Sequence, residues 1–231
     1  MYEKYFKRLL DFVLSLLALI VLSPLLIILS AVGAVAMKGN PFFVQPRPGK
    51  KDKTGNEKIF RLFKLRSMSN KRDANGQLLP DDMRLGKYGA FLRSTSADEL
   101  PSLVNILIGN LSIVGPRPQL VRDMVFMTPK ERKRHDVRPG LTGLAQVNGR
   151  NNITWEQKFR YDLQYIDNGI TLKNDLKIIG QTVGKVLKRS DTVREGTVSD
   201  VDYGDWLLAQ GKIDKETYDE KQKEARELLG V

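Results

Sequence analysis

The sequence contains no cysteine and a single histidine, His135. The first absence excludes disulfide bonds and thiolate metal sites, and the second excludes zinc sites built from several histidines. Because His135 stands in a basic run, we expect it at the surface rather than in catalysis. The common glycine-rich phosphate-binding motifs and the G-x-S-x-G motif are also absent, which excludes the most frequent nucleotide and hydrolase sites.

Acidic residues are too few to balance the basic ones. The 231 residues include 38 Lys and Arg against 27 Asp and Glu, a net charge of +11. This charge indicates anionic partners such as lipid headgroups, nucleotides or phosphates. Aromatic residues are not interleaved with the basic loops as in proteins that bind single strands, so nucleic acid is not an expected partner.

Charge is missing altogether from residues 12–37. As one straight helix this run would be about 39 Å long, more than the ~30 Å hydrocarbon core of a bilayer, so we expect it in the membrane. Pro24 cannot donate a backbone hydrogen bond, which predicts a kink at Ser23 and Pro24. Basic residues on both sides favour a re-entrant helix–break–helix with two cytoplasmic ends. A kinked spanning helix is the equal alternative.

After residue 38 the chain has the pattern of a soluble domain. Residues 42–45 and 59–65 predict a β-hairpin, and a short helix is expected over 85–92. Helices are expected over 96–108, over 154–167 from a capping box of Thr154 and Gln157, and over 172–188. Residues 129–135 predict a short basic helix capped by Thr128. Beyond an acidic linker, residues 206–229 predict a small helical hairpin that serves as a solvated interaction tail.

Asp98 and Glu99 are the first candidates for chemistry. They could simply belong to a capping box in which Ser96 caps the helix and Glu99 occupies the third position, although Pro101 fits that register poorly. Alternatively, Asp98 is a carboxylate nucleophile beside a helix N-terminus that attracts phosphate. Composition alone favours the capping box.

Several arginines stand in rigid loops. A solvated lysine needs no rigid position, whereas an arginine held by Pro or Gly suits bidentate recognition of a diphosphate. A basic surface without a ligand is equally compatible with each position. The candidates are Arg93, Arg117, Arg138 and Arg150, with Lys64 on the second predicted strand. Asp200 and Asp202 form a D-x-D match, which is too short to carry weight.

Seven stretches of the sequence together match a known family in their order and spacing. They are Lys7-Arg8 to Ser23-Pro24, PFFVQPRPG, FKLRSM, RDANGQLLPDDMRLGKYG, LRSTSADELPSLVNILIGNLSIVGPRP, RHDVRPGLTGLAQVNGRN and WEQKFRYDLQYID. Over residues 2–195 the chain resembles the small monotopic phosphoglycosyl transferases, or bacterial sugar transferases. The last residues, 196–231, lie outside the resemblance.

The resemblance implies transfer of a sugar 1-phosphate from a UDP-sugar to undecaprenyl phosphate, with release of UMP. It implies that Asp98 forms a covalent phosphosugar intermediate and contacts Mg²⁺, with Glu99 as its partner carboxylate. Substrate-binding roles map to Lys64, Arg93, Arg117 and Arg150. The apolar segment becomes a re-entrant hairpin broken at Ser23 and Pro24. The branch that uses UDP-N,N′-diacetylbacillosamine is the most similar.

The resulting expectation is a mainly helical α+β, monotopic membrane protein at the cytoplasmic face of the bacterial inner membrane, with a homodimer as one option. Its parts are a membrane hairpin (1–38), a catalytic domain with a small β-hairpin (39–195) and a C-terminal tail (196–231). The alternative is a non-enzymatic basic adaptor tethered to anionic lipid, which the net charge of +11 motivates.

Overall fold

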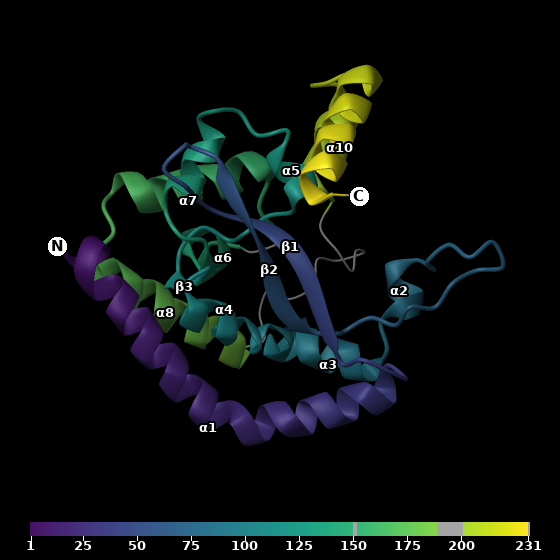
Figure 1. The fold of residues 1–231 in the computed structure, drawn as a ribbon, viewed down its shortest axis with the longest axis horizontal. Coiled ribbons are helices and arrows are strands. Elements are labelled where there is room, and N and C mark those ends of the chain that lie inside the picture. Colours follow the sequence, from purple (N-terminus) through teal and green to yellow (C-terminus); the bar gives the residue numbers. More distant parts are fainter. Residues whose placement is uncertain (150–151, 189–200, 231) are drawn as a thin grey trace.

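The computed structural model describes residues 1–149, 152–188 and 201–230 and shows the expected mainly helical α+β fold (Figure 1). A short π-helical turn, η1 (Tyr2–Phe6), leads into α1 (Lys7–Ala36). The hairpin of β1 (Phe42–Lys51) and β2 (Glu57–Leu65) follows. The next elements are α2 (Asp81–Arg84), α3 (Lys87–Thr95), η2 (Ala97–Glu99), α4 (Ser102–Ile108), β3 (Ser112–Val114), α5 (Val121–Met124), η3 (Glu131–Asp136), β4 (Gly140–Thr142), α6 (Leu144–Val147), α7 (Trp155–Asp167), α8 (Leu172–Lys188), α9 (Tyr203–Ala209) and α10 (Lys215–Leu229).

The predicted hairpin is confirmed, and both strands extend further into the intervening loop than expected. β1 and β2 are antiparallel, with Phe42 opposite Leu65 and Phe43 opposite Lys64. A second, two-stranded parallel sheet of β3 and β4 was not predicted. Its strands have only three residues each, too few to show the alternation by which a strand is recognised.

Helix α1 bends but is not broken. It runs from Lys7 to Ala36 with Pro24 inside it, and Figure 1 shows a change of direction about midway. The Ser23 hydroxyl donates a 2.8 Å hydrogen bond to the carbonyl of Ile20. That carbonyl is the acceptor that the missing N–H of Pro24 would have used in a regular helix. Ser23 therefore satisfies the acceptor that Pro24 leaves free, and the bend needs no interruption of the helix.

The first arm of α1 is attached to the domain by polar side chains. Arg8 donates to the carbonyls of Ile106 and Leu107 at 2.6 and 2.8 Å. Asp11 accepts hydrogen bonds from the Ser112 hydroxyl at 2.7 Å and the Ile113 N–H at 3.0 Å. Arg8 and Asp11, three residues apart on the helix, thus each bind the domain.

The second arm of α1 contacts the same domain. The Tyr88 hydroxyl on α3 donates to the carbonyl of Leu29 at 2.8 Å. Leu29 also packs with Leu65 and Leu92 in a buried cluster. Gly33 faces Tyr88 so closely that a Cβ would lie 2.7 Å from the Tyr88 hydroxyl. Both arms thus meet one side of one domain, as a re-entrant segment requires.

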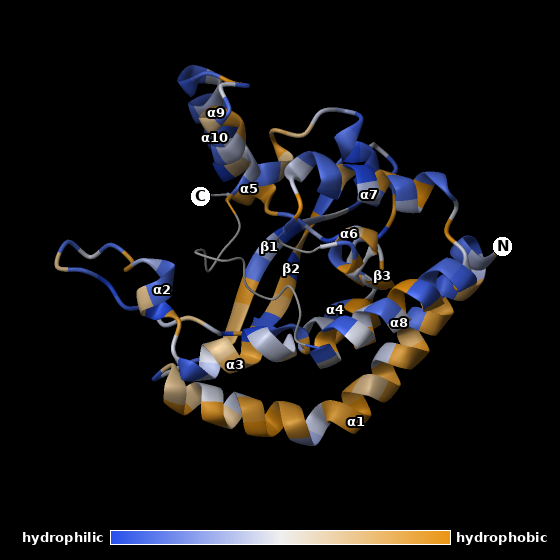
Figure 2. Cartoon of the chain, turned by 180° about the vertical axis from the view of Figure 1, so that it is seen from behind, coloured by the Kyte–Doolittle hydropathy of each residue, from blue (hydrophilic) through white to orange (hydrophobic). Residues whose placement is uncertain are grey.

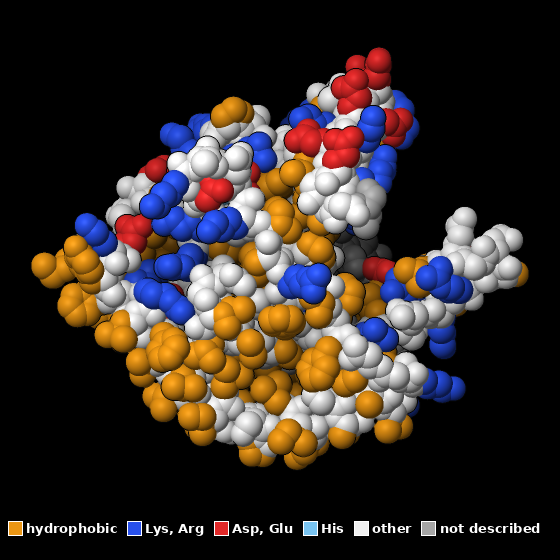
Figure 3. All heavy atoms as spheres, in the orientation of Figure 1, with side chains coloured by type: hydrophobic (Ala, Val, Ile, Leu, Met, Phe, Trp, Pro, Cys, Tyr) orange, Lys and Arg blue, Asp and Glu red, His pale blue; other side chains and the backbone are white. Residues whose placement is uncertain are grey.

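Apolar side chains cover the outer surface of α1. By length and composition, Tyr2–Ala36 could cross a membrane, and only 11% of its most apolar window is buried. Figures 2 and 3 show this apolar surface along α1 and the elements beside it. Exposed members from neighbouring elements include Phe91, Val104, Ile108, Leu172 and Leu176.

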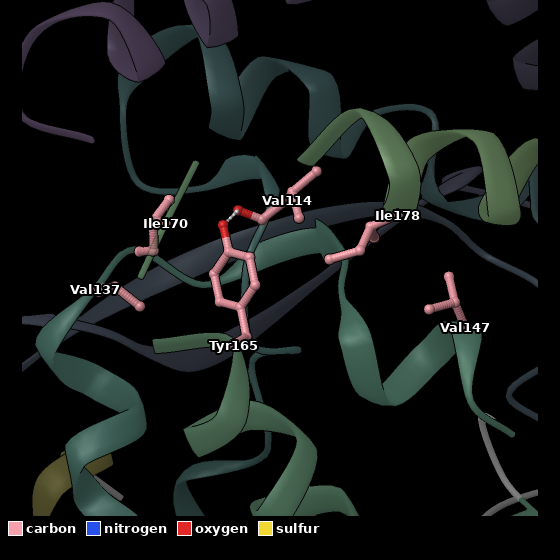
Figure 4. Close-up of a cluster of buried hydrophobic side chains, with 6 residues drawn as sticks. All are labelled: Val114, Val137, Val147, Tyr165, Ile170 and Ile178. Carbon is pink, nitrogen blue, oxygen red and sulfur yellow. Dashed lines mark hydrogen bonds between the residues drawn. The ribbon is translucent and has the colours of Figure 1, made fainter. Parts of the chain in front are cut away.

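The domain core lies between the parallel sheet and the helices that follow it. One cluster joins Val114, Val137, Val147, Tyr165, Ile170 and Ile178 (Figure 4). The Tyr165 hydroxyl is within 3.4 Å of the Val114 carbonyl and 2.8 Å of Asp175 Oδ1. Asp175 also binds Lys7 Nζ at 2.5 Å, so this core cluster is connected to the start of α1.

His135 is buried, so the expectation of a surface position is wrong. Only 2% of it is exposed. Its Nδ1 lies 3.1 Å from Oε1 of Glu57, a carboxylate that Arg132 Nε also contacts at 3.0 Å. Residues of η3 therefore hold the N-terminal end of β2 through Glu57. The predicted basic helix here is a 3₁₀ helix that starts later, at Glu131.

The C-terminal helical hairpin is confirmed as α9 and α10, but the expectation of a solvated tail is wrong. Tyr203, Leu207 and Ala225 are buried. Tyr203 stacks among aromatic rings, with ring centroids 5.0 Å from those of both Trp155 and Phe159 on α7. This C-terminal segment, residues 201–229, is part of the folded domain.

Candidate active site

The acidic pair Asp98 and Glu99 occupies a 3₁₀ turn, not the first turn of an α-helix. The expected helix start at Ser96 is wrong, because Ser96 is left-handed (φ 57°) and its side chain makes no capping hydrogen bond. Helix α4 begins at Ser102, directly after Pro101, where the missing N–H of proline costs no hydrogen bond. Glu99 is therefore not part of a capping box, and its carboxylate binds other side chains.

Helix α4 brings the acidic pair beside Lys64. The Ser102 hydroxyl donates to the carbonyl of Phe63 at 2.7 Å. The buried amide of Asn105 accepts from the Phe63 N–H at 3.0 Å and donates to the Arg61 carbonyl at 2.7 Å. Two helical side chains thus hold the strand backbone next to Lys64, which fixes that residue relative to the pair.

Glu99 is paired with two cations. Its Oε1 accepts from Lys64 Nζ at 2.9 Å and from Arg117 Nη2 at 2.7 Å, and 19% of its side chain is exposed. Burial raises the pKa of Glu99, but Arg117 and Lys64 outweigh this and hold it well below its usual range. Glu99 is therefore ionised at neutral pH, and its charge orients both cations.

Asp98 is different from its neighbour. Within the described part of the chain its carboxylate has no hydrogen-bond or ion-pair partner, although it lines the same cleft. Burial and the charge of Glu99 raise the pKa of Asp98, while Lys64, Arg117 and Arg93 oppose the rise. The result is an available carboxylate held near fixed positive charges.

Arg117 projects from a rigid turn. A Cβ on Gly140 would lie 2.1 Å from the Gly115 nitrogen, so only glycine allows β4 to approach the turn this closely. The carbonyl of Arg117 accepts from Nη2 of Arg134 at 2.6 Å. Arg134 is 1% exposed and pairs with the buried Asp162. A buried ion pair thus fixes the backbone from which Arg117 reaches Glu99.

One cleft of about 1080 Å³ joins most of the predicted site. Lys64, Arg93, Asp98, Glu99 and Arg117 all line it. Arg93 is oriented by the loop after β2, where its Nε donates to the Ser67 hydroxyl at 3.1 Å. Five predicted residues are therefore brought together.

Arg138 is not among the residues that line this cleft. Its Nε donates to the carbonyl of Gly109, at the C-terminal end of α4, at 3.1 Å. Ser23 and Pro24 lie at the bend of α1, but the predicted break is wrong, because the helix continues from Lys7 to Ala36. Arg150 and Asp200 lie outside the described residues, so their predicted roles stay predictions. Asp202 of the discounted D-x-D match does line the cleft.

Sequence reasoning missed further residues of the cleft. Arg47 donates to the carbonyl of Pro118 at 3.0 Å, and burial lowers its pKa to about 10. Asp123 is 2% exposed, and burial raises its pKa to about 6. The proline on each side of Arg47, in PRP, was an available signal, because it matches the setting of Arg117.

Among the carboxylates of the cleft, Asp98 is the one that could contact a divalent cation bound together with a substrate phosphate. No group of three or more His, Cys, Asp or Glu side chains among residues 1–149, 152–188 and 201–230 forms a ready metal site. Mg²⁺ commonly uses one or two carboxylates plus substrate phosphates. The available carboxylate of Asp98 fits that pattern, whereas the cations already held by Glu99 make it a poor ligand.

Comparison with known proteins shows which proteins this chain is similar to. The family model for bacterial sugar transferases matches residues 2–189. An uncharacterised sugar transferase of Bacillus subtilis, EpsL, is 48% identical over 183 residues, which cover 78% of this chain and 87% of that protein. A UDP-glucose:undecaprenyl-phosphate glucose-1-phosphate transferase of Klebsiella pneumoniae is 40% identical over 78% of this chain and 40% of its own length. An undecaprenyl-phosphate galactose phosphotransferase of Salmonella typhimurium is 36% identical over 81% and 41%.

Proposed function

The chain is a phosphoglycosyl transferase of the bacterial sugar transferase family, and we propose that it transfers a sugar 1-phosphate from a UDP-sugar to undecaprenyl phosphate, releasing UMP. The names of the Klebsiella and Salmonella relatives support this reaction type. The observation that carries the assignment is the contrast within the acidic pair: Glu99 is saturated by Lys64 and Arg117, whereas Asp98 is available. Family membership favours an enzyme over the non-enzymatic adaptor.

In the proposed first step, the Asp98 carboxylate attacks the sugar-side phosphorus of the donor. The bond from that phosphorus to the bridging oxygen breaks, UMP leaves, and Asp98 carries the sugar phosphate as an acyl phosphate. In the second step the phosphate oxygen of undecaprenyl phosphate attacks the same phosphorus. The Asp98 carboxylate is released unchanged, so the reaction is ping-pong and each substrate reacts in turn.

The fixed cations supply the electrostatic part of this mechanism. Lys64, Arg93 and Arg117 line the cleft and would face a diphosphate bound beside Asp98. Preorganised positive charge stabilises charge that develops on the leaving phosphate. Glu99 acts as a positioning residue, because its low pKa makes it a poor base and its oxygens hold Lys64 and Arg117. Mg²⁺, held by Asp98 and the donor, would neutralise further phosphate charge.

The bent, apolar α1 supports a reaction at a membrane surface. Both arms of α1 contact the domain, and its outer surface is apolar. A re-entrant insertion keeps the cleft on the cytoplasmic side, at headgroup depth, where the phosphate of the lipid acceptor lies. The inner membrane is the proposed location, and the first membrane step of glycoconjugate assembly is the proposed place in metabolism.

The donor sugar remains a prediction. The sequence favours UDP-N,N′-diacetylbacillosamine or a related N-acetylated sugar, whereas the named relatives use glucose and galactose. A panel of UDP-sugars tests this directly. The homodimer also stays a prediction.

The test is turnover by the full chain in lipid nanodiscs with undecaprenyl phosphate, Mg²⁺ and each UDP-sugar, followed as UMP release. Asp98→Asn keeps the side-chain shape but removes the nucleophile, and we expect it to abolish turnover. Asp219→Asn, on the exposed part of α10 with its partner Lys215, is the matched control and should retain full turnover. Substantial activity in Asp98→Asn would remove Asp98 from the mechanism.

A further inference from the structure

The C-terminal segment, residues 201–229, begins beyond the part of the chain that the family model matches, residues 2–189. Even so, Val201, Asp202 and Asp205 line the same cleft as Asp98 and Glu99. The segment therefore supplies a wall of the active-site cleft that the family model does not describe.

Three contacts fix the start of this wall. Asp202 Oδ2 forms an ion pair with Nη2 of Arg122. The N–H of Tyr203 donates to Oδ1 of the buried Asp123 at 2.8 Å. The indole N–H of Trp155 donates to the carbonyl of Val201 at 3.1 Å. Backbone and side-chain contacts on both sides of Asp202 thus hold its carboxylate in one place.

The carboxylate of Asp202 can accept further hydrogen bonds from a ligand. An ionised carboxylate has about four acceptor positions on two oxygens, and the Arg122 pair engages Oδ2. In the described part of the chain, Oδ1 of Asp202 has no hydrogen-bond partner. The Asp202 side chain is 18% exposed, so it can be reached from the cleft.

The charges along the cleft divide it into two chemically different parts. Around the acidic pair, the cations Lys64, Arg93 and Arg117 suit phosphates. At the other part, Asp202 and Asp205 offset the charge of Arg122, which also lines the cleft, and their carboxylate oxygens can accept hydrogen bonds from hydroxyls. Arg47 lies close enough to both parts of the cleft for the charges of Glu99 and Asp202 to act on its guanidinium.

We propose that Asp202, held by Arg122, is a specificity-determining residue that binds hydroxyl groups of the donor, either the vicinal pair of the ribose or the hydroxyls that the transferred sugar carries. Carboxylates bind such diols through paired hydrogen bonds, as acidic residues do for nucleotide ribose. The proposal rests on the proposed function, because it assumes a UDP-sugar whose diphosphate lies at the cations.

The test compares wild type, Asp202→Asn and the control Asp219→Asn in direct binding and in turnover. Asparagine keeps the shape and the ability to precede a helix, so α9 should form normally. Calorimetry with UMP, UDP and UDP-glucose gives affinities without turnover. The KM and kcat are then measured with the donor that wild type uses best.

We expect Asp202→Asn to weaken donor binding and raise KM roughly tenfold, with kcat within about twofold, because one charge-assisted hydrogen bond is lost. An equal loss for UMP identifies the ribose as the group bound. A loss confined to UDP-sugars identifies the transferred sugar. The proposal is overturned if Asp202→Asn leaves the affinities and KM unchanged, or if Asp219→Asn changes them equally. In either case, turnover by wild type would still support the proposed function. A wild type that binds no uridine nucleotide overturns both.

Discussion

Arg117 Nη2 and Glu99 Oε1 lie 2.7 Å apart, and Lys64 Nζ approaches the same oxygen at 2.9 Å. One carboxylate oxygen thus holds two cations from different parts of the chain. Because Glu99 is occupied in this way, the pairing supports the proposal that the neighbouring Asp98 is the carboxylate that reacts. The proposed roles of Asp98 and Glu99 differ because Glu99 already binds two cations, and not because one is Asp and the other Glu.

Replacing Glu99 by Gln tests its positioning role. The variant loses the charge that holds Lys64 and Arg117, which leaves two cations close together. We expect a loss of about 2 kcal/mol of stability and a drop in kcat of about 10- to 100-fold. A covalent phosphosugar adduct on Asp98 should still form, only more slowly. Complete loss of the adduct in a folded Glu99→Gln variant would show that Glu99 itself takes part in the chemistry.

Ser23 and Pro24 should act as a pair. Ser23→Ala leaves the Ile20 carbonyl without its partner in an apolar segment, at a cost of about 1–3 kcal/mol. Adding Pro24→Ala restores a backbone N–H that can reach that carbonyl, so the double variant should recover stability but lose the bend. Thermal unfolding in nanodiscs measures the stability. If the two substitutions add independently, the two residues do not compensate for each other.

The topology can be measured on a background without cysteine. We expect cysteines at the exposed positions Glu3 and Lys50 both to be shielded from an impermeant thiol reagent outside intact cells, and both to react in inverted vesicles. The reason is that the two arms of α1 contact one domain. Labelling of Glu3→Cys alone from outside would mean that α1 spans the membrane.

Burial of His135 predicts a dependence of stability on pH. Its pKa falls from 6.5 to about 4 in the folded chain, mainly through burial. The imidazole of His135 therefore binds a proton at a higher pH in the unfolded chain than in the folded chain. As the pH falls from about 6.5 to about 4, the free energy of unfolding decreases by about 3 kcal/mol at most. Asp123, with its pKa raised to about 6, acts in the opposite direction.

A comparison with His135→Gln isolates this effect, because Asp123 titrates alike in both proteins. Denaturant unfolding at pH 7, 5.5 and 4.5 should show wild type losing more stability than the variant as pH falls. Parallel curves would mean that His135 does not control this loss.

The sequence predicted those features that depend on local patterns. The β-hairpin, the capping box at Thr154 and the helical C-terminal pair all follow from periodicity and turn residues, and all are present. The grouping of Lys64, Arg93, Asp98, Glu99 and Arg117 in one cleft agrees with the residues that the family resemblance implies.

What the sequence could not provide are contacts between distant segments. Nothing local shows that Glu57 binds His135, 78 residues away, or that Asp11 binds Ser112. The acidic character of the C-terminal segment suggested a solvated tail, yet Tyr203 and Leu207 are buried against α7. A helix start at Ser96 was plausible from its hydroxyl, but Pro101 moved it to Ser102.

In the proposed mechanism Asp98 carries the sugar phosphate. Intact-protein mass spectrometry of the full chain, incubated with Mg²⁺ and a panel of UDP-sugars but no lipid acceptor, tests it most directly. We predict a mass increase equal to one sugar phosphate on wild type, UMP released in equal amount, and neither in Asp98→Asn. Product formation when undecaprenyl phosphate is added, with no adduct on Asp98 when it is left out, would rule out a covalent intermediate on Asp98.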